Sequence, residues 1–234
     1  MTLDELHRSR VGKVSDKWSS YLSYYDQLFS TIKNEKINIL EVGVQNGGSI
    51  ETWVSYFTQG QNFIGCDINP KCSELTFTDD RIKLIIGDIN NEDTFNKIKD
   101  LNLSFDIIID DGSHLSKDII SSFLLYFPLI KPGGIYIVED THTLYQEGNF
   151  SAQKFFYNLV DVLSHEFWPA NFTLQAIFNP VPSFIADGWV DEISFRNSLV
   201  TIHKAKAPGH HKLGDRVIAG QEDLVQNLDH LKIK

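Results

Sequence analysis

The chain has 234 residues, of which 42% are hydrophobic and 22% are charged, and its net charge is -10. These values are typical of one ordinary globular domain that buries its own core, so we predict a single domain over residues 1–234. Its expected parts are an N-terminal helical cap (1–36), a core (37–204) and a C-terminal tail (205–234). The acidic charge and the lack of a basic stripe argue against a nucleic-acid partner.

The start of the chain and its cysteines predict a cytoplasmic protein. Residues 1–10 contain acids and no apolar stretch, so no secretory signal is expected there. No apolar run in the sequence approaches the length of a membrane-spanning helix. Cys66 and Cys72 are too few for a disulfide framework and have no other metal ligands nearby, so we expect both to be reduced.

Strand-like and helix-like patterns alternate along most of the chain. Apolar runs rich in Ile, Val and Leu predict buried strands at 37–44, 62–69, 81–90, 105–110 and 133–140. Helical spacing of apolar residues predicts helices at 15–33, 47–59, 91–102, 116–130 and 151–168. Ser15 or Asp16 is the expected N-cap of the first of these helices. This alternation indicates the α/β class, with a parallel sheet covered on both faces.

The C-terminal third departs from this alternation. Residues 169–188 are rich in aromatic residues and proline and show no clear period. Residues 189–204 predict two strands joined at residues 196–198 in a hairpin. This ending differs from that of dinucleotide-binding folds, which usually finish with another parallel unit. A short helix is expected at 221–232, within the tail.

The first three strands end in residues that favour a nucleotide-like ligand, because open α/β sheets bind ligands beyond the carboxyl ends of their strands. Gly43 permits a sharp turn, but Gln45 stands where a dinucleotide fingerprint needs glycine, which argues against NAD. Asp67 and Asp88 end the next two strands, and Asp67 falls where an acid can accept both hydroxyls of a ribose. Each aspartate can also be a turn or capping residue. S-Adenosylmethionine, which has a ribose and no pyrophosphate, fits best.

Motifs along the chain resemble those of the class I S-adenosylmethionine-dependent methyltransferases. In chain order they read ILEVGVQNGGSIETW, IGCDINP, IIGDI, FDIIIDDGSH and KPGGIYIVED. More narrowly, SDKWSSYLSYYDQLF, DDGSH and EDTHTLY are similar to the sugar O-methyltransferases of macrolide biosynthesis, the macrocin and mycinamicin type. The resemblance covers residues 15–204. It implies a Rossmann-like, seven-stranded, mostly parallel sheet whose last strand is antiparallel.

The same resemblance implies a cofactor site. Glu41 and Gly43 would line the methionine part of S-adenosylmethionine, Asp67 would hold the ribose, and Asp88 would lie near the adenine. Asp110 is assigned to this site as well. It can also be a turn residue, or an acid that supports the neighbouring metal ligands.

Acids and a histidine follow the fourth and fifth strands. Asp111 ends the fourth strand, and Glu139 and Asp140 end the fifth, so their carboxylates converge if the strands are neighbours. Such a cluster suits a divalent cation, and Mg²⁺ prefers oxygen ligands. His114 follows Asp111 by three residues, and histidine is the usual general base near neutral pH. The resemblance assigns these same roles to the three acids and to His114, although DDG alone is a common turn.

The predicted function is metal-dependent transfer of a methyl group from S-adenosylmethionine to a sugar hydroxyl, on an antibiotic, a glycolipid or a surface polysaccharide. A catechol-like acceptor and a binding protein without turnover are the alternatives. Tyr21, Tyr25 and His142 are expected to contact the acceptor, with packing or loop roles as the alternative. Residues 169–188 are expected to help shape the acceptor pocket, and a homo-oligomer remains open.

Overall fold

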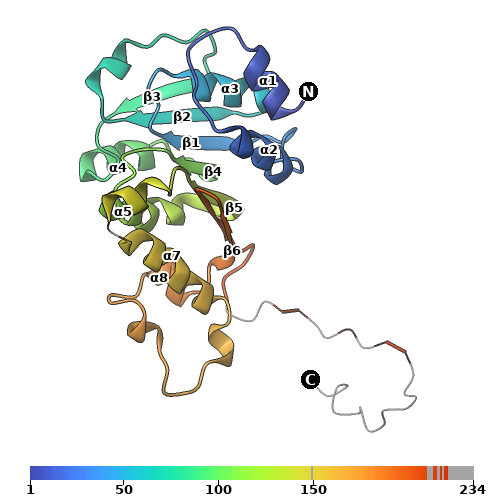
Figure 1. Ribbon diagram of the computed structural model, residues 1–234, viewed down its shortest axis with the longest axis vertical. Coiled ribbons are helices and arrows are strands. Elements are labelled where there is room, and N and C mark those ends of the chain that lie inside the picture. The colour runs from blue at the N-terminus through green and yellow to red at the C-terminus, as the bar shows by residue number, and fades with distance from the viewer. Residues whose placement is uncertain (149, 210–212, 215–216, 218, 221–234) are drawn as a thin grey trace.

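The fold is built around one seven-stranded sheet. The computed structural model describes residues 1–148, 150–209, 213–214, 217 and 219–220. The strands follow the order β3-β2-β1-β4-β5-β7-β6 across the sheet (Figure 1). They are β1 (Asn38–Val42), β2 (Asn62–Asp67), β3 (Ile82–Ile86), β4 (Phe105–Asp110), β5 (Ile130–Val138), β6 (Val190–Arg196) and β7 (Leu199–Lys204).

The strand pairing confirms the predicted α/β, Rossmann-like fold with a mostly parallel sheet. β1 pairs in parallel with β2 and β4, β2 pairs with β3, and β4 pairs with β5. β7 runs antiparallel to both β5 and β6, so the predicted hairpin forms, with Asn197 and Ser198 at its turn. The strand order reverses between β1 and β4. Open α/β sheets bind their ligands beside such a switch point.

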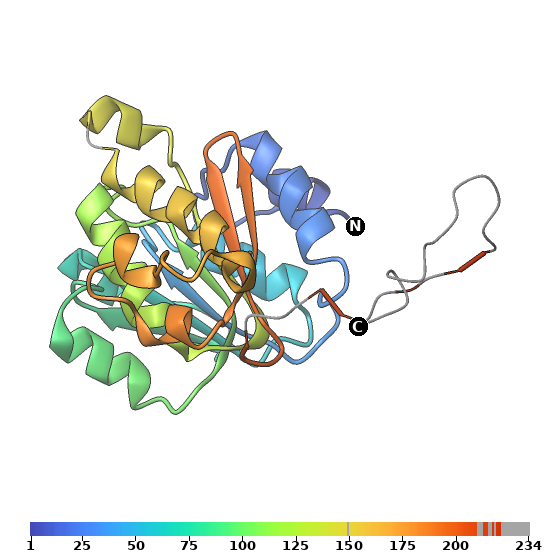
Figure 2. The same ribbon diagram turned by 90° about the horizontal axis from the view of Figure 1, so that it is seen from below.

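Helices cover both faces of the sheet (Figure 2). Two clusters of buried hydrophobic residues hold them there. One cluster packs the first three helices against one face of the sheet, and the other packs later helices against the opposite face. The first group is α1 (Leu3–Ser9), α2 (Ser19–Leu28) and α3 (Gly48–Tyr56), and the second is α4 (Glu92–Lys99), α5 (Ser116–Tyr126), α7 (Ser151–Val162) and α8 (Ser183–Ala186). Shorter elements are α6 (Thr143–Glu147) and 3₁₀ turns at Pro70–Glu74, Phe127–Leu129, His165–Phe167 and Leu174–Ala176.

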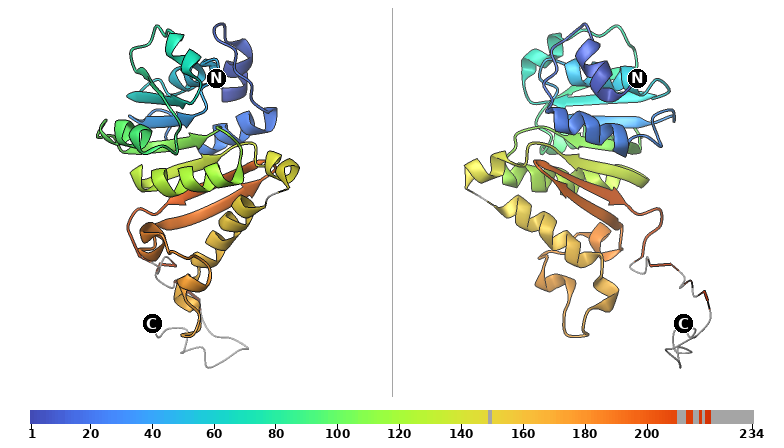
Figure 3. Two further views of the ribbon diagram at one scale, coloured as in Figure 1. Left: turned by 90° about the vertical axis from the view of Figure 1, so that its left-hand side faces the viewer. Right: turned by 45° about the vertical axis from the view of Figure 1, so that its right-hand side comes forward.

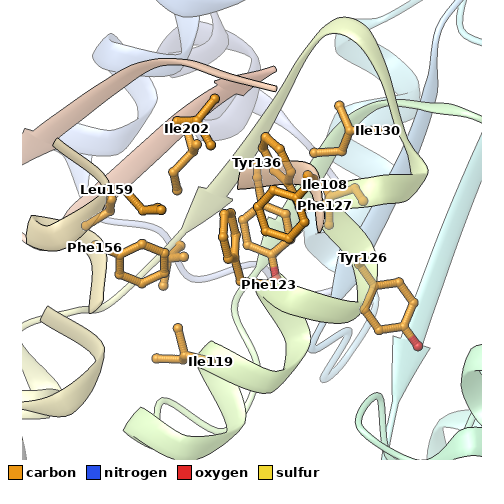
Figure 4. Packing of buried hydrophobic residues seen from close by; sticks show 14 of the residues in the cluster. Ile108, Ile119, Phe123, Tyr126, Phe127, Ile130, Tyr136, Phe156, Leu159 and Ile202 are labelled. Atoms are coloured by element: carbon orange, nitrogen blue, oxygen red, sulfur yellow. The ribbon is translucent and has the colours of Figure 1, made fainter. Parts of the chain in front are cut away.

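The side chains of β4 divide the core in two. Ile107 and Ile109 belong to the cluster under α1 to α3, whereas Ile108 joins Phe123 and Tyr136 on the opposite face. In that second cluster the Phe123 ring packs edge-on against Tyr136, with centroids 5.2 Å apart (Figure 4). Every residue of β4 is buried, including Asp106 and Asp110, and the three isoleucines between these two acids form its apolar run. The two cores fix the edge at which β4 and β5 end.

The structure corrects the start of the predicted helix at 15–33. α2 begins at Ser19 and its N-cap is Trp18, which makes no capping hydrogen bond, so neither Ser15 nor Asp16 caps the helix. Residues 14–17 instead line the cavity described below. The earlier helix α1 was not predicted. Its start is stabilised by a capping box. The Thr2 side chain accepts the backbone N–H of Glu5, and the Glu5 side chain accepts the backbone N–H of Thr2.

Residues 169–188 contribute several buried side chains to the core. Leu174, Phe178 and Phe184 are buried in the cluster around Phe123. The segment lines neither of the two cavities described below, and its expected role in an acceptor pocket stays a prediction. The expected helix at 221–232 lies outside the described residues. Of the helices that the structure describes, none combines the length and apolar character needed to cross a bilayer.

Candidate active site

A cavity of about 460 Å³ lies beyond the carboxyl ends of β1 to β4, and we call it the main cavity. Residues 14–17, between α1 and α2, form part of its wall. Its volume falls in the range of about 300–1,000 Å³ typical of cofactor pockets. The predicted site residues that line it are Gly43, Asp67, Asp88, Asp110, Asp111, His114 and Asp140. The predicted site residues outside its lining are Glu41, Glu139, Tyr21, Tyr25 and His142.

The turns that follow β1 and β4 touch through their backbones. Gly43 has a φ of 85°, and a Cβ at this position would lie 2.1 Å from the carbonyl oxygen of Asp111. A Cβ on Gly48 would lie 2.0 Å from the carbonyl oxygen of Val14. Only glycine fits at either position. The β4 turn and the segment 14–17 are therefore held close to the end of β1.

Asp67 ties the turn after β1 to the end of β2. Its Oδ2 accepts the backbone N–H groups of Val44 and Gln45, each at 2.8 Å, and its Oδ1 accepts that of Asn69 at 2.8 Å. These bonds leave part of the acceptor capacity of the carboxylate unused, so it can also accept ribose hydroxyls. Asp88 is exposed at the same rim, after β3. Both acids therefore lie where the sequence placed them.

Two polar atoms of the main cavity lack partners. Ser15 Oγ and Asn90 Oδ1 are buried and make no hydrogen bond within the part of the chain that the structure describes. Both residues line the cavity. Buried polar atoms are nearly always hydrogen-bonded, to protein or to ordered water. An unpaired hydroxyl and an unpaired amide oxygen in one cavity therefore suit a polar ligand.

Asp111, His114 and Asp140 form the candidate metal centre. Each offers one ligand atom, and these atoms lie within 4.8 Å of one another. His114 Nε2 is 3.9 Å from Asp111 Oδ1. Asp140 Oδ1 accepts hydrogen bonds from the Tyr21 hydroxyl at 2.7 Å and from the Trp18 indole N–H at 3.1 Å. These donors fix the Asp140 carboxylate just after β5, beside the imidazole.

Glu139 is not part of this cluster, and its carboxylate is paired with Lys17. Lys17 Nζ lies 2.8 Å from Glu139 Oε2 and 2.5 Å from Asp111 Oδ2, and the lysine side chain is only 3% exposed. Burial disfavours the ammonium, but the Glu139 and Asp111 carboxylates outweigh burial and raise the pKa of Lys17. The Tyr25 hydroxyl donates to the other oxygen of Glu139 at 2.7 Å. The buried ammonium of Lys17 thus lies in a place where the sequence analysis predicted only acidic side chains.

The predicted acceptor contacts are occupied with other partners. Tyr21 and Tyr25 are at most 1% exposed, and their hydroxyls bond Asp140 and Glu139, so each phenol holds an acid in place. His142 lines a second cavity, and its Nδ1 makes a short contact with the hydroxyl of Ser198. Direct contact between these three side chains and an acceptor stays a prediction.

Burial also shifts the pKa of two predicted cofactor-site acids. Glu41 is fully buried, which raises its pKa to about 7, although it accepts hydrogen bonds from Ser49 Oγ at 2.9 Å and Trp53 Nε1 at 3.0 Å. Asp110 is 4% exposed, and burial raises its pKa to about 6. It accepts a hydrogen bond from the Tyr136 hydroxyl at 3.1 Å. Both acids are therefore held at the ends of their strands, and Asp110 also lines the main cavity.

Left-handed backbone is concentrated at the site. Five non-glycine residues of the described chain have positive φ, and four of them are Gln45, His114, Asp140 and Ser198. Side chains with a Cβ rarely adopt this conformation, and such residues gather at functional sites. Gln45, His114 and Asp140 line the main cavity. The turns that carry His114 and Asp140 therefore set the direction of both side chains.

Sequence reasoning did not find three residues that hold the acids. They are Lys17, Trp53 and Tyr136, the partners of Glu139, Glu41 and Asp110. The motif SDKW was recognised as part of the family resemblance, and this is the signal that singles out Lys17. Trp53 and Tyr136 carry no local signal, because each reads as an ordinary aromatic residue of a buried helix or strand face.

The strand order and pairing are those of the class I methyltransferase fold. Residues 40–141 match a family model described as a methyltransferase domain, which spans β1 to the acids after β5. The MycE methyltransferase from the mycinamycin biosynthetic pathway, solved in complex with Mg and SAH, is 26% identical with a TM-score of 0.71. The match covers 88% of this chain and 55% of that chain. A MycE structure that also contains mycinamycin VI gives a TM-score of 0.70.

The chain contains a methyltransferase domain, and the relatives that it matches include O-methyltransferases of the macrocin and mycinamicin type. Demethylmacrocin O-methyltransferase of Streptomyces fradiae is 31% identical over 67% of this chain and 44% of its own length. Mycinamicin VI 2''-O-methyltransferase of Micromonospora griseorubida is 33% identical over 64% of this chain and 41% of its own length. A rhamnosyl tetracenomycin-C 2'-O-methyltransferase of Streptomyces olivaceus is 29% identical over 84% of this chain and 53% of its own length. The chain spans about half the length of the curated relatives it matches.

Replacing Lys17 by methionine is expected to lower the free energy of unfolding by about 3–5 kcal/mol, because buried Glu139 loses its balancing ammonium. Burial already raises the pKa of Glu139, and the loss of Lys17 raises it further. The destabilisation relative to wild type should therefore grow with pH only above about 7, because below that value folded wild type and folded variant both keep the Glu139 proton that the unfolded chain has released. Urea unfolding at several pH values measures both effects. Lys154→Met, at an exposed lysine, is the control, and equal stability of the two variants would contradict the inferred pair.

Glu41 is expected to give the stability of the protein a pH dependence. Folding raises its pKa from 4.5 to about 7, so between these values the folded state holds a proton that the unfolded chain has released. The stability from this group is complete below the lower pKa and falls as pH rises toward the higher one, by up to ~1.4 kcal/mol per pH unit. Glu41→Gln should remove this slope. Unfolding curves of both proteins across that pH range measure it, and an unchanged slope would show that Glu41 is not its source.

Proposed function

We propose that this chain is a metal-dependent methyltransferase that moves a methyl group from S-adenosylmethionine to a hydroxyl of a sugar-bearing acceptor. The observation that carries the proposal is the cluster of Asp111, His114 and Asp140 at the main cavity. It combines two carboxylates, which suit a hard cation, with an imidazole, which suits a proton acceptor. One relative acts on a rhamnosyl tetracenomycin, and MycE was solved with mycinamycin VI, which supports this class of acceptor.

The main cavity supports S-adenosylmethionine as the methyl donor. Asp67 is placed to accept ribose hydroxyls, and Asp88 and the unpaired amide oxygen of Asn90 lie together after β3, where we place the adenine. The unpaired hydroxyl of Ser15 can donate to a carboxylate, such as that of the methionine part. When bound, the cofactor supplies an electrophilic methyl group.

The remaining predicted cofactor residues shape this site in the proposal. Gly43 allows the ligand to approach the backbone after β1, since no side chain stands there. Glu41 and Asp110 are buried, and their hydrogen bonds to Trp53 and Tyr136 hold the ends of β1 and β4 in place. We therefore propose that these two acids position the cofactor loops, with any direct contact limited to Asp110, which lines the cavity.

Asp111 and Asp140 are the proposed ligands of a divalent cation, with Mg²⁺ as the first candidate. Mg²⁺ takes oxygen ligands and usually keeps several waters, so one or two carboxylates can anchor it. The imidazole nitrogen of His114 then stays available as a base. Glu139, the third predicted ligand, is engaged by Lys17 and Tyr25, and its role as a ligand stays a prediction. When bound, the cation lowers the pKa of a nearby hydroxyl.

His114 is the proposed general base. In the transfer, the bond between sulfur and methyl breaks and a bond between the acceptor oxygen and methyl forms, while the hydroxyl proton moves to His114 Nε2. The Asp111 carboxylate, whose Oδ1 is 3.9 Å from that nitrogen, stabilises the resulting imidazolium. Lys17 holds the other oxygen of Asp111, so the carboxylate keeps its orientation during the step.

Two other functions are outcomes that experiment can distinguish. A catechol-like acceptor has vicinal hydroxyls that suit the same cluster, and parallel screens of sugars and phenols separate it from a sugar. A protein that binds the cofactor and methylates neither kind of acceptor would be a binding protein. Cys66 and Cys72 are free and buried, as expected. The cytoplasmic location and the homo-oligomer stay predictions.

Removal of divalent cations is expected to abolish methyl transfer, and Mg²⁺ should restore it, because the two carboxylates act through the cation. Transfer of a labelled methyl group to a pool of sugar acceptors measures this before and after treatment with EDTA. Calorimetric titration of Mg²⁺ gives a readout that does not depend on turnover. Asp140→Asn should weaken that binding and leave SAH binding nearly unchanged. Activity that survives rigorous chelation would remove the cation from the proposal.

His114→Ala is expected to lower kcat by roughly 10²–10⁴-fold, the usual contribution of a general base, and to change the Kd for SAH little. His203→Gln, in β7 and away from the cavity lining, is the matched control and should retain wild-type kcat. An unchanged kcat in His114→Ala would overturn the assignment of the base.

A further inference from the structure

A second cavity, of about 190 Å³, adjoins the site, and we call it the side cavity. It is lined by residues of α6, of α7 and of the tip of the β6–β7 hairpin, which lie side by side (Figure 3). Its lining begins at Thr141, directly after the proposed ligand Asp140. The volume is far above the ~10–15 Å³ that one water requires, and a group the size of a single ring fits it.

Gln153, on α7, carries the clearest sign of a missing ligand. Its side chain lines the side cavity and is only 9% exposed. Neither Nε2 nor Oε1 makes a hydrogen bond with any residue that the structure describes. A buried amide without partners destabilises the folded state, and native proteins rarely contain one unless water or a ligand satisfies it. The amide presents a donor and an acceptor side by side.

Exposed aromatic side chains gather at the same cavity. Tyr157 and Phe195 line it and pack together with ring centroids 5.0 Å apart, although they are 53% and 39% exposed. Tyr145, also in the lining, is 61% exposed and packs against Phe150 with centroids 5.5 Å apart. Clusters of exposed apolar surface mark binding sites in folded proteins. The rim therefore offers ring faces above a buried polar floor.

The wall of the side cavity is bonded to the candidate metal centre. The Ser198 carbonyl accepts the Thr141 N–H at 3.1 Å and the Tyr21 hydroxyl at 3.0 Å. The same Tyr21 hydroxyl lies 2.7 Å from Asp140 Oδ1. Only this wall therefore separates a ligand in the side cavity from the proposed reaction centre. It is close enough to belong to the same molecule as the hydroxyl that is methylated.

We propose that the side cavity binds a saccharide ring of the acceptor, next to the sugar that is methylated. This inference rests on the proposed function and refines its acceptor to a glycoconjugate with at least two rings. Neighbouring hydroxyls of a saccharide can donate to and accept from the Gln153 amide together. The C–H face of the ring packs on Tyr157 and Phe195. Arg196, which stacks 4.2 Å from the Tyr24 ring, adds further donors to the lining.

Other ligand classes fit the side cavity less well. An alkyl chain would cover the aromatic rings but leave both atoms of the Gln153 amide unpaired. A flat aromatic aglycone would stack on the rim but has few hydroxyls to satisfy the donor and the acceptor at once. A saccharide ring has both an apolar face and a dense set of hydroxyl groups. The combination of a ring-sized space, an orphaned amide and exposed aromatic rings therefore favours carbohydrate.

Nuclear magnetic resonance titration tests the proposal with four probes, the methyl pyranosides of L-rhamnose, D-glucose, D-galactose and D-mannose, in the presence of SAH and Mg²⁺. At least one probe should shift the side-chain amide resonance of Gln153, which is identified by its loss in Gln153→Leu. The Kd for that probe should rise at least tenfold in Gln153→Leu and in Tyr157→Ala. Gln61→Leu, at an exposed glutamine, is the control and should bind as wild type does.

The absence of any shift with all four glycosides would overturn the proposal, and so would wild-type binding by Gln153→Leu. A shift caused by 2-naphthol alone would assign the side cavity to an aromatic aglycone and would overturn the saccharide as well. Thermal unfolding without ligand adds an independent measure. Gln153→Leu should melt at a higher temperature than wild type, because it removes an unsatisfied buried amide. A lower melting temperature would mean that Gln153 stabilises the fold, which contradicts a ligand role.

Methyl-transfer kinetics separate this proposal from the proposed function. If a glycoside binds at Gln153 but no sugar is ever methylated, the proposed function fails while the ring-binding site stands. If sugars are methylated with the same KM by wild type and Gln153→Leu, the ring-binding site fails while the proposed function stands. A KM raised at least tenfold in Gln153→Leu, with kcat and SAH binding nearly unchanged, would support both.

Discussion

The buried ammonium of Lys17 is the contact on which the site depends. It lies between Asp111, after β4, and Glu139, after β5, so it balances acids that neighbouring parallel strands necessarily bring together. Without a cation there, ionised carboxylates this close and this buried would repel one another or take up protons. The same side chain holds residues 14–17 across the carboxyl edge of the sheet. One residue thus provides both charge balance and part of the wall of the main cavity.

Burial divides the acids of the site into a buried framework and a partly exposed pair. Glu41, Asp110 and Glu139 are buried, burial raises their pKa, and aromatic N–H or O–H groups donate to each of them. Asp111 and Asp140 remain partly exposed at the cavity. The framework fixes the backbone from which this pair projects, so its direction is set before any ligand arrives. Fixed charges of this kind need little reorganisation when chemistry begins.

The fold was predictable because the buried parallel strands contain runs of apolar residues. The stretch FDIIIDDGSH marked the point where one such run is followed by Asp111 and His114. The order of strand ends also placed Asp67 and Asp88 at one edge. Contacts of long range were not predictable. Lys17 meets partners 94 and 122 residues away, so no local pattern encodes its burial. Ser15 and Asp16 have good capping propensity, but the segment crosses the main cavity instead. Gln153 reads as an ordinary helix residue until the distant hairpin covers it.

The division of the two cavities along the chain has an evolutionary consequence. Apart from residues 14–17, the main cavity is built from residues 42–140, nearly the same stretch that the family-wide model spans, whereas the side cavity is built from residues 141–200. The proposed methyl-donor site and the proposed acceptor site therefore occupy consecutive stretches of the polypeptide. Substitution, insertion or recombination after residue 141 can therefore change the proposed acceptor site without altering the residues of the proposed methyl-donor site.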